Sequence, residues 1–229
     1  MGFTRKGILK LKDLAITQEY LICAVNSKGK ISGFSTEKLV CLIASGLLEL
    51  QLEDCIKIDK KRVTVTNDLP DEKLYLKPLY DFVNQQKPVK LEKILAAYTY
   101  SFTDKNLHEL IDSIGASLDD LGLVETTRTG IFGNKNAYVP NVNAVHYVVD
   151  MIRAEFLEDV EVTEDIALLI VLLDKSKLLK TYFSKYEQKE MKQKLKDLAN
   201  SDTGKMINEM IVYMENMIAT MAVLITAYN

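Results

Sequence analysis

The stretch Asp165-Ile166-Ala167-Leu168-Leu169-Ile170-Val171-Leu172-Leu173 decides the fold of this chain. From Ile166 onward its residues are apolar without interruption, so a helix formed here is apolar around its whole circumference. Such a helix has to be covered on every side, because any open face would leave apolar surface in water. We therefore predict a central helix over residues 163–174, around which the rest of the chain packs.

Helical patterns lie on both sides of this central stretch. Apolar residues recur three and four positions apart, and only 4 Pro and 10 Gly interrupt the 229 residues, which favours long helices. We predict N-caps at Ser35 and Asp104 and helix ends at Gly46 and Gly122. The other predicted helices cover about residues 17–26, 36–45, 71–86, 90–101, 104–121, 142–157, 176–199 with a bend near 184, and 204–228.

Two parts of the chain change to a period of two residues, which is typical of strands. The alternating runs cover residues 48–52, 56–58, 63–65, 123–127 and 137–139. Each part follows a helix and a glycine, an order with the shape of a winged-helix module. The sequence therefore predicts a mainly α fold, a single helical domain with small β-hairpins at its edge. We expect this domain over residues 11–229, after a flexible N-terminus over residues 1–10.

Charge and hydropathy exclude several classes of protein. The formal net charge of −3 gives no bulk attraction to nucleic acid, and the acidic balance of the predicted helix 104–121 would repel phosphates. The longest uncharged apolar stretch, Met217–Tyr228, is too short for a bilayer core, which takes about 20 residues. Met1–Lys12 lacks the apolar run of a signal peptide. We expect a cytoplasmic protein with no transmembrane segment and no nucleic-acid partner.

The residue types that carry chemistry show no catalytic or metal-binding pattern. Cys23, Cys41 and Cys55 are odd in number and fit no disulfide or metal spacing, which suits a reducing compartment. His108 and His146 do not form a paired-ligand spacing. The glycines near residue 130 lack the Lys-Ser/Thr ending of a phosphate-binding loop. We expect no metal, no cofactor and no enzymatic activity.

The tip of the second predicted hairpin combines two bulky apolar residues with basic neighbours. Ile131 and Phe132 lie between Arg128 and Lys135. In one interpretation the apolar pair inserts into a membrane interface while the basic groups meet lipid headgroups. In the other, the hairpin packs on its own core or on a second subunit. Both interpretations stay open at this point.

The order of these segments resembles the Golgi phosphoprotein 3 family. The resemblance covers nearly the whole chain from about residue 11, and the absence of the long charged N-terminal tail of eukaryotic members suits a prokaryotic relative. The residues that carry it are Thr17–Leu21, Leu39–Leu50, Ile114–Val124, Asp165–Leu173, Leu178-Leu179, Phe183-Ser184, Met191, Lys196-Asp197-Leu198 and Met221–Asn229.

The resemblance implies a mainly α-helical protein peripheral to the membrane. Eukaryotic members bind phosphatidylinositol 4-phosphate and act as adaptors for membrane enzymes, and their hairpin, here Arg128 to Ala137, helps membrane contact and self-association. The family's lipid pocket uses a Trp and several Arg, and this chain keeps none of them. The pocket positions that can be placed fall at Ser35, His108 and Ile111.

Anionic phospholipid headgroups are the partner that the resemblance implies, together with homo-oligomers. A predicted helix begins at Ser35 and would attract an anion, and three lysines lie nearby in sequence. The expected lipid- or anion-binding residues are Lys28, Lys30, Ser35, Lys38, His108 and Ile111. The alternative is a cytosolic interaction or scaffold protein that self-associates through its hairpin without binding lipid.

Overall fold

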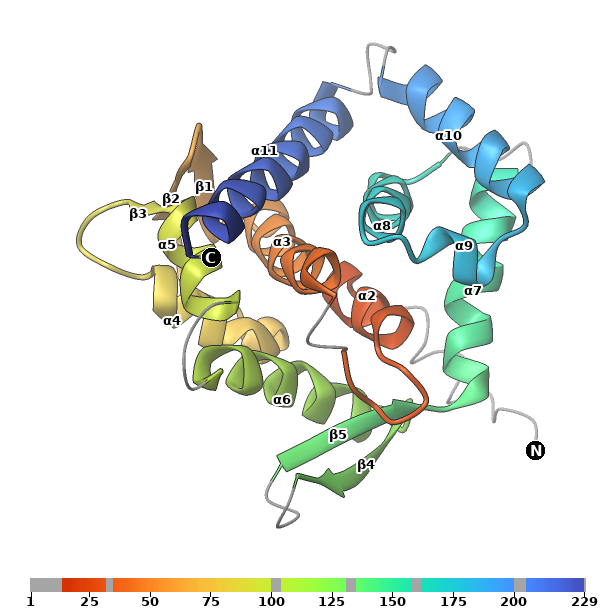
Figure 1. Ribbon diagram of the computed structural model, residues 1–229, viewed down its shortest axis with the longest axis horizontal. Helices are drawn as coiled ribbons and strands as arrows, with labels where there is room; N and C mark the ends of the chain where they lie inside the picture. Colours follow the sequence, from red (N-terminus) through yellow and green to blue (C-terminus); the bar gives the residue numbers. More distant parts are fainter. Residues whose placement is uncertain are drawn as a thin grey trace.

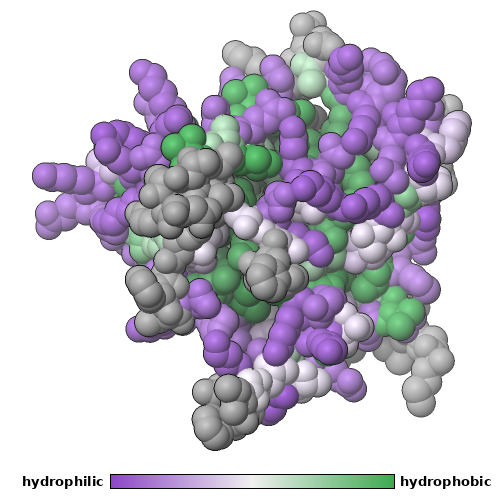
Figure 2. All heavy atoms as spheres, in the orientation of Figure 1, coloured by the Kyte–Doolittle hydropathy of each residue, from purple (hydrophilic) through white to green (hydrophobic). Residues whose placement is uncertain are grey.

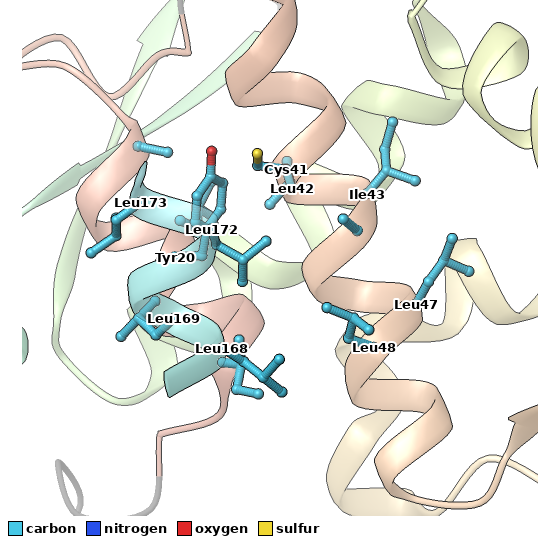
Figure 3. Packing of buried hydrophobic residues seen from close by; sticks show 14 of the residues in the cluster. Tyr20, Cys41, Leu42, Ile43, Leu47, Leu48, Leu168, Leu169, Leu172 and Leu173 are labelled. Carbon is cyan, nitrogen blue, oxygen red and sulfur yellow. The ribbon is translucent and has the colours of Figure 1, made fainter. Parts of the chain in front are cut away.

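A computed structural model describes residues 14–31, 35–99, 104–130, 135–157, 162–199 and 205–228. Its centre consists of three helices, α2 (Ile16–Ala24), α3 (Thr36–Leu52) and α8 (Glu164–Lys175), which contact one another pairwise (Figure 1). Every residue from Ile166 to Leu173 is buried, so the predicted central helix is confirmed. Figure 3 shows Leu168 and Leu172 on the side of α8 toward α3, with Tyr20 of α2 beside Cys41 of α3.

The remaining helices cover this centre on several sides. α11 contacts α3, α5 and α8, α7 contacts α2 and α8, and α6 contacts α2, α4 and α5. The bounds of these outer elements are η1 (Asp71–Leu76), α4 (Lys77–Val83), α5 (Leu91–Thr99), α6 (Lys105–Asp120), α7 (Val142–Leu157), α9 (Leu179–Tyr182), α10 (Lys185–Ala199) and α11 (Lys205–Tyr228). On the face shown in Figure 2, hydrophilic side chains gather over α10, while hydrophobic residues show between polar ones near the middle. In the described part of the chain, no helix combines the length and the apolarity that crossing a bilayer requires.

Two small antiparallel sheets lie at the edge of the helices, as predicted (Figure 1). The first has the order β1-β2-β3 and comprises β1 (Ile56–Asp59), β2 (Arg62–Val65) and β3 (Val89–Lys90). The second pairs β4 (Val124–Thr129) with β5 (Lys135–Pro140) and contacts α6. The mainly α fold with small edge hairpins is therefore confirmed.

The strand predicted over residues 48–52 is wrong, because α3 continues through Leu52. Gly46 does not end the helix. A Cβ at Gly46 would lie 2.7 Å from Leu79 Cδ2, so the glycine lets α3 and α4 pack closely. Glu49, one of the polar residues that alternate with leucines in this run, is buried and accepts hydrogen bonds inside the protein. Only the second of the two predicted helix-glycine-strand-hairpin units is formed.

The predicted helix ends have mixed outcomes. Gly122 ends α6 as expected, with φ +71 and its N–H donating to the carbonyl of Asp119 at 2.8 Å. Ser35 and Asp104 occupy the N-cap positions of α3 and α6 as predicted, but neither side chain accepts a capping hydrogen bond from the described residues. The predicted flexible segment over residues 1–10 and the hairpin tip with Ile131 and Phe132 lie outside the described residues.

Candidate functional site

The turn after α2 is fixed to the second hairpin. Asn26 Oδ1 accepts hydrogen bonds from the N–H groups of Lys28 at 2.8 Å and Lys30 at 3.3 Å, which closes the turn. The carbonyl of Gly29 accepts from the N–H of Tyr138 in β5 at 3.2 Å. Gly29 has φ +66, and a Cβ there would lie 2.6 Å from the backbone of Tyr138, so only glycine fits this contact. This docking brings Lys30 to the hairpin.

The hairpin itself is held on α6 by Tyr138. Gly115 leaves room for the Tyr138 ring, since a Cβ at this position would lie 2.4 Å from the ring. The Tyr138 hydroxyl donates to the carbonyl of Asp112 at 3.3 Å. Farther along the hairpin, the Nζ of Lys135 lies 2.6 Å from Nε2 of His108 on α6. A lysine ammonium can only donate hydrogen bonds, so in this contact Nε2 of His108 is the acceptor.

A groove with a volume of about 530 Å³ opens between these segments. We call it the α6–β5 groove. Its apolar lining includes Leu39 and Ile111, and its cations are Lys30 and Lys135, which two aspartates balance in formal charge. All lining residues in the described part of the chain are Gly29, Lys30, Ile31, Leu39, Thr99, Asp104, Leu107, His108, Ile111, Asp112, Thr129, Lys135 and Asn136.

The polar groups of the α6–β5 groove leave bonding capacity for a ligand. Asn136 Nδ2 donates to the Tyr138 hydroxyl at 3.2 Å, while Asn136 Oδ1 is buried and has no hydrogen-bond partner among the described residues. Buried polar atoms normally have partners, so this oxygen is a candidate acceptor for a ligand donor. The lysines can donate to a phosphate, and the aspartates can accept from hydroxyl groups. The arrangement therefore suits an amphiphile whose head carries both phosphate and hydroxyl groups.

Half of the residues predicted as a lipid or anion site meet in this groove. Lys30, His108 and Ile111 line it, together with Lys135 from the predicted hairpin. The predicted site residues that do not line it are Lys28, Ser35, Lys38 and Arg128. In β4, Arg128 pairs in register with Asn136 of β5.

Sequence reasoning missed the groove residues Leu39, Asp104, Asp112 and Asn136 as a set. Part of the signal was available, because Asp104, His108 and Ile111 recur four and three residues apart and so share one face of α6. Nothing in the sequence indicated that the turn at Lys30 reaches this face.

A separate network of carboxyl groups lies where α2, α3 and η1 meet. Glu49 accepts hydrogen bonds from the N–H of Thr17 at 3.1 Å, from Lys73 Nζ at 3.2 Å and from the Tyr75 hydroxyl. Lys73 also pairs with Glu53 at 2.9 Å. These contacts compensate the buried charge of Glu49 and explain why it is tolerated in the core.

Glu19 is also buried, but no hydrogen bond from the described residues reaches its carboxyl group. Burial raises the pKa of Glu19 to about 8, and the nearby carboxylates Asp165, Glu49 and Glu155 add to the increase. A carboxyl group in this setting favours its neutral form at neutral pH.

The cysteines do not form a reactive site. Cys23, Cys41 and Cys55 are free and buried. Burial raises the pKa of the Cys41 thiol to about 12 and that of Cys23 higher still. A thiol that stays protonated is a poor nucleophile and a poor metal ligand. Among the described residues, no group of three or more His, Cys, Asp or Glu side chains is arranged to hold a metal ion.

Comparison with known proteins identifies a family that the chain matches. A family described as Golgi phosphoprotein 3 (GPP34) matches residues 16–214, which run from the start of α2 into α11 and include all segments of the α6–β5 groove. No protein with a curated description matches the chain. The matched range confirms the family that the order of sequence segments indicated.

Proposed function

The chain belongs to the Golgi phosphoprotein 3 family, and from this membership we propose that it is an adaptor-like peripheral membrane protein that binds anionic phospholipid headgroups in the α6–β5 groove. The observation that carries the proposal is the meeting of Lys30, His108 and Lys135 in one groove, from three segments far apart in sequence. Charge-assisted hydrogen bonds from the two lysines, Lys30 and Lys135, hold a phosphate more strongly than neutral donors do.

The composition of the groove favours a phosphorylated polyol over a zwitterionic headgroup. Lys30 and Lys135 supply donors for phosphate oxygens, while Asp104, Asp112 and Asn136 Oδ1, which accepts no hydrogen bond within the described ranges, supply acceptors for hydroxyl groups. Phosphatidylinositol 4-phosphate, which the family resemblance implies for eukaryotic members, is a headgroup of this kind. The apolar lining accommodates the less polar part of the same ligand.

Co-sedimentation with vesicles tests the proposal. We compare phosphatidylcholine vesicles with vesicles that also contain phosphatidylserine or phosphatidylinositol 4-phosphate, at low and moderate salt. The variant Lys30→Glu/Lys135→Glu should bind anionic vesicles at least about tenfold more weakly, because a basic group near the surface contributes about 1 kcal/mol. Lys57→Glu/Lys87→Glu is the matched control, since it changes the charge equally at two exposed lysines outside the groove.

Two outcomes would reject the groove as the binding site. One is that the unsubstituted protein binds none of the anionic vesicles at low salt. The other is that the control variant loses as much binding as the groove variant, because the contacts would then reflect overall charge. Stronger binding to phosphatidylinositol 4-phosphate than to phosphatidylserine at matched charge would support recognition of the phosphorylated polyol.

The second candidate function is a scaffold that self-associates through the β4–β5 hairpin. It is favoured by the hairpin's two-stranded sheet: in the described part of the chain the outer edge of β4 has no neighbouring strand, whereas the turn at Gly29 docks on β5. Unpaired edges are templates for pairing with another copy. Ile131→Asp/Phe132→Asp distinguishes the two functions. A lower molar mass in light scattering with unchanged vesicle binding would favour the scaffold. Weaker vesicle binding at unchanged molar mass would favour membrane contact.

A further inference from the structure

A second cavity, with a volume of about 720 Å³, lies where the described chain begins. We call it the acidic groove. It is lined by Leu14, Ala15 and Ile16 at the start of α2, and by side chains from α3, η1, α6 and α8. The described lining residues are Leu14, Ala15, Ile16, Gln18, Glu49, Leu52, Glu53, Glu72, Lys73, Tyr75, Ser117, Asp120, Leu121 and Asp165.

The charge of the acidic groove is strongly unbalanced. Its carboxyl groups belong to Glu49, Glu53, Glu72, Asp120 and Asp165, and Lys73 is its only cation among the described residues. Lys73 is already paired with Glu49 and Glu53. The other three carboxyl groups have no ion pair or hydrogen bond in the described part of the chain. Partial desolvation and the Glu49 carboxylate raise the pKa of Asp165, as expected where negative potential is uncompensated.

The chain that precedes the acidic groove has the opposite charge. Among residues 1–13 the basic residues are Arg5, Lys6, Lys10 and Lys12, against the single acid Asp13. Apolar residues alternate with these cations, namely Phe3, Ile8, Leu9 and Leu11. This segment joins Leu14, which is part of the groove lining. It is therefore tethered at the groove and complementary to it in both charge and apolar character.

We propose that residues 5–12 of the chain's own N-terminal segment bind in the acidic groove. Extended chain spans roughly 3.3–3.6 Å per residue, so a segment of this length can cross a groove of this size from Leu14. A short tether holds the segment at an effective concentration in the millimolar range, so weak contacts suffice for occupancy. Lys10 and Lys12 pair with two of the three carboxyl groups that have no partner in the described part of the chain, and Leu9 and Leu11 cover the apolar lining from Leu52 and Leu121. The occupied groove withholds this basic segment from other anionic partners.

Trypsin provides a direct readout, because it cleaves after Arg5, Lys6, Lys10 and Lys12 in the segment itself. We measure cleavage rates by mass spectrometry in the full chain and in Glu72→Lys/Asp120→Lys, which reverses two exposed groove carboxylates. We expect cleavage after Lys10 and Lys12 to be about tenfold faster in the variant, since proteolysis follows the population of the released segment. Raising the salt concentration should speed cleavage of the unsubstituted protein and leave the variant nearly unchanged.

Glu125→Lys/Glu190→Lys is the control for overall charge, because both residues are exposed and outside the acidic groove. Its cleavage rates should equal those of the unsubstituted protein. If Glu72→Lys/Asp120→Lys does not fold by circular dichroism, the neutral pair Glu72→Gln/Asp120→Asn replaces it. Equal cleavage rates in the groove variant and the unsubstituted protein would overturn the proposal.

A dye on an introduced cysteine gives an independent measurement. The three native cysteines are buried, so Gly7→Cys labels selectively on the segment. Dye anisotropy should fall when Lys10→Glu/Lys12→Glu is added, and should not depend on protein concentration. Anisotropy that rises with protein concentration would place the segment in the groove of a second copy and overturn binding within one chain.

Discussion

The central helices and the α6–hairpin unit bury apolar surface in different ways. α8 is buried on all sides from Ile166 to Leu173, whereas α6 buries one face, with Leu110, Ile114 and Leu118 inside and several acidic residues outside. A helix with only one buried face keeps the other available for a ligand. The α6–β5 groove forms on α6 for this reason, while the centre serves packing.

Polar groups in the two regions also have different roles. In the centre, Glu49 is held by three donors, while Glu19 has none among the described residues. In the α6–β5 groove, Lys30, His108 and Lys135 lie at the surface, where solvent or a ligand can satisfy them. A polar group in the centre therefore affects stability, and one on α6 affects binding.

The largest expected contrast between the regions comes from truncating one apolar side chain in each. Leu172→Ala should lower the free energy of unfolding by about 2–5 kcal/mol, because Leu172 is fully buried on α8 and its removal leaves a cavity. Ile111→Ala, on the half-buried face of α6, should cost less than about 2 kcal/mol. Urea unfolding measures both values. Equal losses of stability in the two variants would contradict the distinction between the central helices and the α6–hairpin unit.

A second contrast is the pH dependence that Glu19 gives to the centre. The folded-state pKa of about 8 lies above the ordinary value of 4.5, so the folded protein binds this proton more tightly than the unfolded chain. Stability is therefore lost as the pH rises from 4.5 to 8, and Glu19→Gln should remove that loss. We expect the variant to be more stable by up to about 5 kcal/mol at pH 9, because each unit of pKa difference is worth about 1.4 kcal/mol.

Unfolding experiments at pH 5 and pH 9 check this expectation. The stability difference between Glu19→Gln and the unsubstituted protein should shrink toward pH 5, where the carboxyl group is largely protonated in the folded protein. Glu125→Gln, on the exposed surface of β4, is the control and should show little pH-dependent difference. A difference for Glu19→Gln that does not change with pH would show that this carboxyl group is not the cause.

The smallest of the three effects concerns the contact that joins the hairpin to α6. Gly115→Ala should lower stability by about 1–3 kcal/mol, because the added methyl group overlaps the Tyr138 ring. Gly122→Ala is a poor comparison, since its φ is positive, but Ala116→Ser on the exposed face of α6 should be nearly neutral. Unfolding in urea measures the stability of both variants. If adding Tyr138→Leu to Gly115→Ala recovers part of the lost stability, the overlap with the Tyr138 ring is confirmed.

The sequence predicted the centre better than the groove, and for a physical reason. An unbroken apolar helix such as Ile166–Leu173 has only one stable environment, so its position follows from its own residues. The run Leu48–Leu52 fits either a strand or one face of a helix, and the partners of Glu49 decide between them. Those partners, Lys73 and Tyr75, are distant in sequence and could not be read from the run itself.

The α6–β5 groove shows the same limit. Lys30 and Lys135 meet only because the turn at Gly29 docks on Tyr138, a contact between residues far apart in the chain. His108 and Ile111 entered the predicted site through the family resemblance, and both line the groove. Lys28 and Lys38 lie near Ser35 in sequence, but neither lines the groove. Nearness along a chain does not fix the direction of a side chain.

The pairing of α2 with a much later part of the chain bears on how the protein is made. The Tyr182 hydroxyl donates to the carbonyl of Cys23 at 2.7 Å, across 159 positions. Ribosomes add roughly 5–20 residues per second, so the end of α2 waits about 8–30 s before Tyr182 is even synthesised. For most of that time α8 is not available to cover α2 and α3. Chaperones that bind exposed apolar segments of nascent chains therefore have a long interval in which to act.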